Sequence, residues 1–178
     1  MKTDILISGF GGQGLMSLGK ILARAATCEG KHTIFFPSYG AEMRGGTAHC
    51  LVKISDLSIA SPFMDSPDVA IIFNQPSLDK FRSEFRQNSL VILNSDLIPK
   101  INLKTGIKTI ALPLNEMALE CGNIKVANII VLGVLSALKP KLLARKTIIS
   151  ILEETFSKKG SFEVNLKAFK LGERFNKP

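Results

Sequence analysis

A glycine-rich hexapeptide near the start of the chain constrains the possible fold more than any other feature. Its sequence is Gly9-Phe10-Gly11-Gly12-Gln13-Gly14. It fits the pattern G-x-G-x-x-G and follows the apolar run 4–8, which is typical of a strand buried on both faces. Apolar residues at helical spacing follow it over 13–28. A strand, a glycine loop and a helix in this order predict the opening unit of a parallel α/β sheet.

The rest of the chain alternates between short apolar runs and amphipathic stretches. We predict strands at residues 33–36, 47–54, 58–60, 69–73, 90–93 and 109–112. We predict helices at residues 75–86, 115–121, 125–139, 140–158 and 162–175. This alternation favours an α/β fold with a doubly wound, mostly parallel sheet and a helical C-terminal third. The first 36 residues are expected to form a βαβ unit, and the whole chain, 1–178, a single domain.

The glycine loop suits a phosphate group, because glycines let an anion approach the free amides at a helix N-terminus. A dinucleotide site also needs an acidic residue about 20 residues further on, to hold the ribose hydroxyls. The second predicted strand ends Phe36-Pro37-Ser38 and carries no acid. Two interpretations therefore stay open. Residues Gly9, Gly11, Gly12, Gln13 and Gly14 bind a phosphate, or they only allow close packing of strand and helix.

A second glycine-rich loop, residues 38–46, follows the second predicted strand. Its candidate functional residues are Tyr39, Glu42, Arg44, Gly45 and Gly46. In open α/β sheets, ligands bind at the carboxyl edge of the strands, and an Arg there can grip a carboxylate or phosphate with two hydrogen bonds. Alternatively, Glu42 pairs with Arg44 and only stiffens the loop.

Charge and composition exclude several functions. The net charge is +8, of which residues 101–178 supply +7. Such a region attracts an acidic protein, an anionic membrane or nucleic acid, or it is simply a solvated face. Because the chain has no run of five basic residues, no Trp and one Tyr, we expect no nucleic-acid partner.

The three cysteines, Cys28, Cys50 and Cys121, lie far apart and form no C-x-x-C motif. We therefore expect no metal site, no iron–sulfur site and a reducing, cytoplasmic environment. No secretory leader is apparent, because glycines interrupt the chain from Gly9 onward. The longest apolar stretch, 126–138, is too short for a membrane span and predicts a buried helix.

Two polar positions have mainly structural interpretations. His49 and Cys50 are neighbours on a predicted strand and so point to opposite faces, which makes them a poor nucleophile and base pair. Asn128 lies inside an apolar helix, where it either satisfies a buried backbone group or meets a partner subunit.

Several segments taken together resemble the gamma subunit of 2-oxoacid:ferredoxin oxidoreductases. They are residues 7–14, residues 37–46, Ser61-Pro62, Asp68, Ala127-Asn128 and Leu132-Gly133. The order and spacing of these segments cover nearly the whole chain, and the combination of the two loops is the specific part. The loop at 37–46 is more similar to the 2-oxoglutarate branch than to the pyruvate branch, and a branched-chain 2-oxoacid enzyme is a further candidate.

The resemblance implies a Rossmann-like, non-catalytic subunit of a complex that converts 2-oxoglutarate to succinyl-CoA. Thiamine diphosphate, Mg²⁺ and the iron–sulfur clusters are then expected on other subunits, and ferredoxin or flavodoxin accepts the electrons. The loop containing Tyr39 and Arg44 would face the catalytic subunits or coenzyme A. The alternatives are the gamma subunit of a pyruvate or branched-chain enzyme, or a stand-alone nucleotide-binding module.

Overall fold

The computed structural model describes residues 1–38 and 47–175. Their strands are β1 (Lys2–Gly9), β2 (His32–Ser38), β3 (Ala48–Ser55), β4 (Val69–Ile72), β5 (Leu90–Asn94) and β6 (Lys108–Leu112). Their α-helices are α1 (Leu15–Cys28), α2 (Gln75–Phe81), α3 (Leu114–Glu120), α4 (Ala127–Leu138), α5 (Arg145–Phe156) and α6 (Phe162–Glu173). Short 3₁₀ helices are η1 (Arg82–Glu84), η2 (Ile124–Val126) and η3 (Ser157–Lys159).

The described strands form one sheet in the order β2-β3-β1-β4-β5-β6. Strands β1, β4, β5 and β6 are parallel neighbours, while β3 runs antiparallel to both β1 and β2. The predicted α/β, mostly parallel sheet is therefore confirmed. Strands β1 and β2, which belong to the expected βαβ unit, run in the same direction, and β3 lies between them in the sheet.

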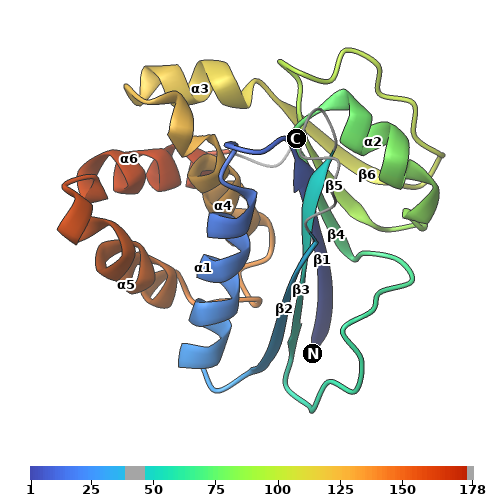
Figure 1. The fold of residues 1–178 in the computed structure, drawn as a ribbon, viewed down its shortest axis with the longest axis horizontal. Coiled ribbons are helices and arrows are strands. Elements are labelled where there is room, and N and C mark those ends of the chain that lie inside the picture. The colour runs from blue at the N-terminus through green and yellow to red at the C-terminus, as the bar shows by residue number, and fades with distance from the viewer. Residues whose placement is uncertain (39–46, 176–178) are drawn as a thin grey trace.

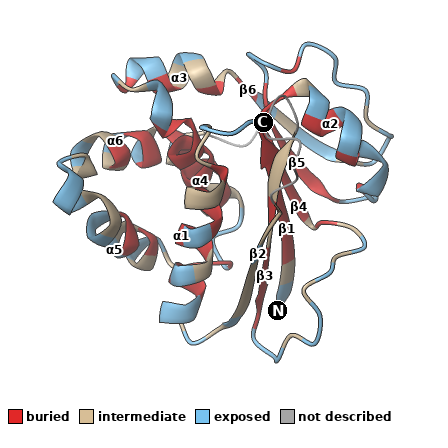
Figure 2. Cartoon of the chain, in the orientation of Figure 1, coloured by how far each residue is buried: buried red, intermediate tan, exposed pale blue. Residues whose placement is uncertain are grey.

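Helices cover the sheet unevenly (Figure 1). Helices α1, α3, α4, α5 and α6 lie on one side, and α2 lies on the other. Alternating residues of β1 show this division, because Ile5 and Ile7 belong to the large core under α1 and α4 while Leu6 belongs to a smaller core under α2. The buried surfaces of α1, α4 and the central strands face one another in Figure 2.

The helical C-terminal third is also confirmed, and two glycines set its closest packing. A Cβ added at Gly133 of α4 would lie 2.1 Å from the carbonyl oxygen of Phe169, and one added at Gly172 of α6 would lie 2.0 Å from that of Ile130. Because the nearest atoms belong to backbone, α4 and α6 touch through their main chains. Neither position has room for a side chain.

Three expected elements differ from the structure. Residues 58–60 form no strand, and the helix expected at 75–86 ends at Phe81 and continues only as η1. The helix expected from Pro140 begins at Arg145. Residues before it are held by tertiary contacts instead, because Glu29 accepts a hydrogen bond from the amide of Ala144 at 2.7 Å.

Candidate functional site

The glycine loop lies at the carboxyl end of β1, beside the end of β4 (Figure 1). The chain leaves β1 toward α1 on one side of the sheet and leaves β4 toward α2 on the other. This reversal makes a topological switch point, which is where open α/β sheets bind their ligands. The sheet thus places the predicted loop at the edge where ligand chemistry is expected.

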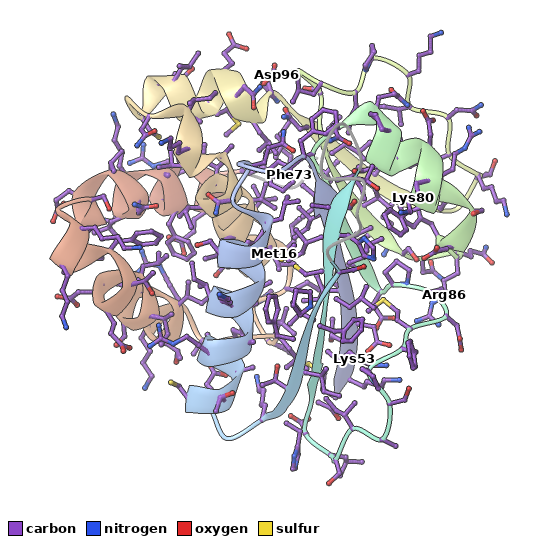
Figure 3. All side chains as sticks on the ribbon, in the orientation of Figure 1. Met16, Lys53, Phe73, Lys80, Arg86 and Asp96 are labelled. Atoms are coloured by element: carbon purple, nitrogen blue, oxygen red, sulfur yellow. The ribbon has the colours of Figure 1, made fainter. Side chains whose placement is uncertain are left out.

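Glycine is required at both ends of this loop for different reasons. A Cβ at Gly9 would lie 2.8 Å from the Cβ of Phe73, so this glycine lets β1 and the end of β4 come close. Gly14 has φ +75°, and a Cβ there would lie 2.4 Å from Nδ2 of Asn128. Figure 3 labels Phe73 at this end of the strands, above Met16 of α1. The packing interpretation of these two glycines therefore has direct structural support.

The middle of the loop is different, because nothing lies within 4 Å of a Cβ added at Gly11 or Gly12. Gln13 folds back over the loop, and its Oε1 accepts the amide hydrogen of Phe10 at 2.7 Å. That amide is consequently occupied by the loop's own side chain. Helix α1 begins with Gly14 as its N-cap, without a side-chain cap, so its first turn has amides free of a capping side chain.

Asn128 connects this loop to α4. Its side chain is buried, and Nδ2 donates a hydrogen bond to the carbonyl oxygen of Gly14 at 3.0 Å. The prediction that Asn128 satisfies a buried backbone group is confirmed. Its Oδ1 is buried and has no hydrogen-bond partner among the described residues.

Side chains at the ends of β4 and β5 were not singled out from the sequence, and they belong to this edge. Asn74 caps α2 by accepting the amide hydrogen of Ser77 at 2.9 Å, and its buried Nδ2 has no partner in the described part of the chain. Asp96 caps α3 by accepting the amide hydrogen of Asn115 at 2.7 Å, and Figure 3 places it beside that helix. A polar residue directly after a buried strand is the sequence signal that identifies such positions.

The second candidate loop connects β2 to β3. Tyr39, Glu42, Arg44, Gly45 and Gly46 all lie outside the described residues, so their roles stay predictions. The sheet order agrees with the lack of an acid on β2. In a dinucleotide site the strand next to β1 supplies the acid that holds the ribose. Here the strand next to β1 is the antiparallel β3, whose Ala48 pairs with Gly9.

The cysteines do not fit a cluster or a catalytic pair. Burial raises the pKa of the Cys50 thiol to about 12, and its Sγ lies 3.6 Å from the carbonyl oxygen of Leu15. His49 points to the other face and packs edge-on against Phe81 at 5.0 Å between ring centroids, where burial and then Lys80 lower its pKa. The predicted separation of these two side chains is confirmed. Within residues 1–38 and 47–175 no three His, Cys, Asp or Glu side chains group as metal ligands.

Two surface hollows lie away from the glycine loop. One of about 690 Å³ is at the amino ends of the strands, between the start of β1, the turn before β5 and the loop after α4. Another of about 280 Å³ lies between α3 and α6, where Lys167, Lys170 and Arg174 line it together with Glu120 and Glu163. At this hollow the basic excess of the C-terminal third is therefore partly balanced by acidic side chains. No helix in the described ranges has the length and apolarity needed to cross a membrane.

The model of one protein family, described as pyruvate ferredoxin/flavodoxin oxidoreductase, matches residues 4–175. The chain belongs to this family. It is 31% identical to the solved gamma subunit of a keto/oxoacid ferredoxin oxidoreductase from Geobacter sulfurreducens, with a TM-score of 0.81 over 96% of this chain and 95% of the other. The expected resemblance to the family's gamma subunits is therefore confirmed.

Curated relatives in this family differ in name and length. The chain is 40% identical to ketoisovalerate oxidoreductase subunit VorA of Methanothermobacter marburgensis, over 96% of this chain but 36% of the relative. It is 34% identical to 2-oxoglutarate synthase subunit KorC of Methanocaldococcus jannaschii, over 97% of this chain and 92% of the relative. The chain thus spans about a third of the first relative and nearly all of the second.

A longer solved structure shares the fold. It is a 2-oxoglutarate:ferredoxin oxidoreductase from Magnetococcus marinus with 2-oxoglutarate, coenzyme A and succinyl-CoA bound. The TM-score is 0.88 at 24% identity, over 97% of this chain and 30% of that one. The fold therefore occurs both as a short chain and as one part of a longer one.

Proposed function

We propose that this chain is a gamma-type, non-catalytic subunit of a 2-oxoacid:ferredoxin oxidoreductase. Such a complex oxidatively decarboxylates a 2-oxoacid, forms the acyl-CoA and passes electrons to ferredoxin or flavodoxin. The observation that carries the proposal is the family match over residues 4–175, together with near full-length similarity to a small subunit. We place the complex in the cytoplasm and treat 1–178 as one functional domain.

The proposal assigns thiamine diphosphate, Mg²⁺ and the iron–sulfur clusters to other subunits. Iron–sulfur clusters are held by several thiolates that converge on one point. Here Cys28 ends α1, Cys50 is inside β3 and Cys121 follows α3, so their thiols come from separate elements. These three residues therefore do not fit a cluster.

For the 2-oxoacid we propose 2-oxoglutarate. The support is the similarity to small subunits named for 2-oxoglutarate synthase, which match along nearly their whole length. A branched-chain 2-oxoacid is the second candidate, because identity is higher, at 40%, with a subunit named for ketoisovalerate. Pyruvate stays a further alternative, since a gamma subunit common to pyruvate and ketoisovalerate enzymes is 31% identical.

Both glycine-rich loops are assigned to contacts within the complex. We propose that Gly9, Gly11, Gly12, Gln13 and Gly14 meet either coenzyme A or a neighbouring subunit. The loop residues Tyr39, Glu42, Arg44, Gly45 and Gly46 are proposed to face the catalytic subunits or coenzyme A. Arg44 carries the only side chain in these loops with a permanent positive charge, which suits the phosphates or carboxylate of such a ligand.

An omission assay tests this proposal. The complex is assembled with and without this chain, and coenzyme A-dependent reduction of ferredoxin is measured with 2-oxoglutarate, 2-oxoisovalerate and pyruvate in turn. We expect turnover only when the chain is present, and fastest with 2-oxoglutarate. Fastest turnover with 2-oxoisovalerate would favour the second candidate, and full turnover without the chain would refute the subunit role.

The stand-alone nucleotide-binding module is the competing class. It predicts micromolar binding of NAD by the isolated chain, whereas β3 beside the glycine loop and the absence of an acid on β2 argue against such affinity. Titration calorimetry of the isolated chain with NAD separates the two. A saturable micromolar isotherm would favour the module over the subunit.

A further inference from the structure

Two phenylalanines form an exposed aromatic pair at the edge of the sheet. Phe36 comes from β2, and Phe63 comes from the segment 56–68 that connects β3 to β4. Their ring centroids lie 6.2 Å apart in an edge-to-face arrangement, and Phe63 remains 72% exposed. Single apolar side chains are common on protein surfaces, whereas exposed apolar side chains that adjoin one another are the feature that marks interaction surfaces.

A buried lysine holds Phe63 in this position. Lys53 of β3 is 4% exposed, and its Nζ donates a hydrogen bond to the carbonyl oxygen of Phe63 at 2.5 Å. The same Nζ lies 3.5 Å from the carboxylate of Asp4 on β1. A buried ammonium group needs such partners, so Lys53 fixes the backbone of the segment while the ring of Phe63 faces solvent. Figure 3 shows Lys53 low on the sheet, far from Phe73 and the glycine loop.

Strand β2 forms this edge of the sheet. It is the outermost strand and pairs with β3 alone among the described strands. Its residues, His32–Ser38, include no Lys, Arg, Asp or Glu, but Pro37 is a residue that proteins place on edge strands to limit pairing, so a contact here involves side chains rather than an added strand. Figure 2 shows β2 as only partly buried, whereas β1 and β4 are buried. On the same face, α2 packs over β1, β4 and β5 and reaches His49 and Leu51 of β3, while the core cluster under α2 includes no residue of β2.

We propose that the aromatic pair of Phe36 and Phe63, with the β2 edge beside it, docks this chain onto the catalytic subunit of its oxidoreductase complex. This inference rests on the proposed function. A relative of this chain indicates the partner. That relative is 40% identical to this chain but matches it over only 36% of its own length. In the relative, the matching region is therefore joined to a much larger part of the same polypeptide. We propose that this larger part, or the separate catalytic subunit that corresponds to it, covers the aromatic pair of Phe36 and Phe63.

The contact is expected to be apolar. A preorganised aromatic side chain loses little conformational freedom on binding, so Phe63 has the properties of a binding hot spot. This distinguishes the docking surface from the basic C-terminal region, whose contacts would weaken as salt is added. Affinity that depends on Phe63 should therefore change little between low and high ionic strength.

The test measures binding of the tagged chain to the purified catalytic subunits of the same complex. Phe63→Ala is the main variant because its side chain is mostly exposed, so its removal leaves folding intact. Leu119→Ala is the matched control, since Leu119 is 64% exposed on α3, on the opposite side of the sheet. We expect Phe63→Ala to weaken binding roughly thirtyfold at both 0.05 and 0.5 M salt, and Leu119→Ala to leave it unchanged.

The outcomes separate the two proposals. If the wild-type chain binds and Phe63→Ala binds equally well, the docking surface is wrong and the proposed function stands. If the wild-type chain does not bind the catalytic subunits at all, both are wrong. If the wild-type chain instead forms dimers that Phe63→Ala abolishes, a second copy occupies the surface and the inference is overturned. Circular dichroism of each variant confirms that it is folded.

Discussion

Gly14 has a left-handed backbone conformation and a closely packed neighbour at the same position. Because φ at Gly14 is +75°, an L-amino acid such as alanine placed there would destabilise the fold by about 1–2 kcal/mol relative to glycine. The added Cβ would also displace Asn128 from the carbonyl oxygen of Gly14. We expect Gly14→Ala to lower the free energy of unfolding by about 2 kcal/mol or more in urea titrations.

Gly11→Ala is the control for this prediction. Gly11 has no positive φ and no atom within 4 Å of an added Cβ, so its substitution should change stability by less than about 0.5 kcal/mol. Equal stabilities of the two variants would contradict the packing role that we assign to Gly14.

Arg44→Ala tests the other loop through activity. If Arg44 binds an anionic ligand or a partner carboxylate, its loss removes a charge-assisted interaction, and kcat/KM of the assembled enzyme should fall about tenfold or more. Arg44→Lys keeps the charge without the guanidinium fork and should recover only part of the loss. Unchanged kinetics for Arg44→Ala would contradict this role and favour the alternative, in which Arg44 pairs with Glu42 within the loop.

At the residue scale, sequence patterns predicted some contacts and missed others. Asn128 was predictable because an amide inside an apolar helix must find a partner, and the partner is Gly14. The hydrogen bond from the Phe10 amide to Gln13 was not predictable, since it depends on the backbone angles of the glycines between them. The same limit applies to Lys53, whose burial depends on a segment that has no regular structure.

Helices α4 and α6 depend on glycines that let their backbones touch. Gly133→Ala gains helix propensity of about 1 kcal/mol, but its Cβ meets the backbone of α6 at 2.1 Å, and the helices must separate. We expect a net loss of about 2–3 kcal/mol in the free energy of unfolding. Gly19→Ala in α1 should cost less, because its Cβ meets side chains rather than backbone, namely the ring of Phe35 at 2.6 Å and Sγ of Cys50 at 2.9 Å. The reverse order of stabilities would contradict this packing.

The loop before α5 is attached to the end of α1 by Glu29. Burial raises the pKa of Glu29, but hydrogen bonds from the Ala144 amide and from Lys31 outweigh it, and the folded-state pKa is below the ordinary value. A lowered folded-state pKa adds stability above the unfolded pKa of about 4.3, and this contribution is lost as pH falls through the folded pKa.

The wild-type chain should therefore lose its stability advantage over Glu29→Gln as pH falls from 6 to 3. Urea titrations at pH 6, 4 and 3 measure this difference. A difference that stays constant across that range would show that the carboxylate of Glu29 does not carry the attachment.

Elements were predictable where local pattern decides them and not where long-range contacts do. The apolar run at 69–73 and the periodic stretch at 125–139 correspond to β4 and to η2 with α4. The place of β3 between β1 and β2 depends on pairing across the whole sheet, which local composition does not determine. Likewise, α5 begins at Arg145 rather than near Pro140, because contacts from Glu29 hold the residues before it.

At the scale of the molecule, its two unequal sides suggest how it assembles. In the part of the chain that the structure describes, α1, α3, α4, α5 and α6 lie on one side of the sheet, whereas α2 lies on the other, where Phe63 remains exposed. The glycine loop lies at a third place, the carboxyl edge of the sheet. The contact proposed for the glycine loop and the docking proposed for Phe36 and Phe63 therefore involve separate surfaces.

We propose above all that this chain works as one subunit beside others that hold the cofactors. Native mass spectrometry of the particle recovered with the tagged chain is the decisive measurement. We predict a hetero-oligomer in which larger subunits carry thiamine diphosphate and iron–sulfur clusters and in which the chain itself, released as a 19.4 kDa species, carries neither. Recovery of the chain without larger subunits, or with a bound nucleotide alone, would contradict the claim.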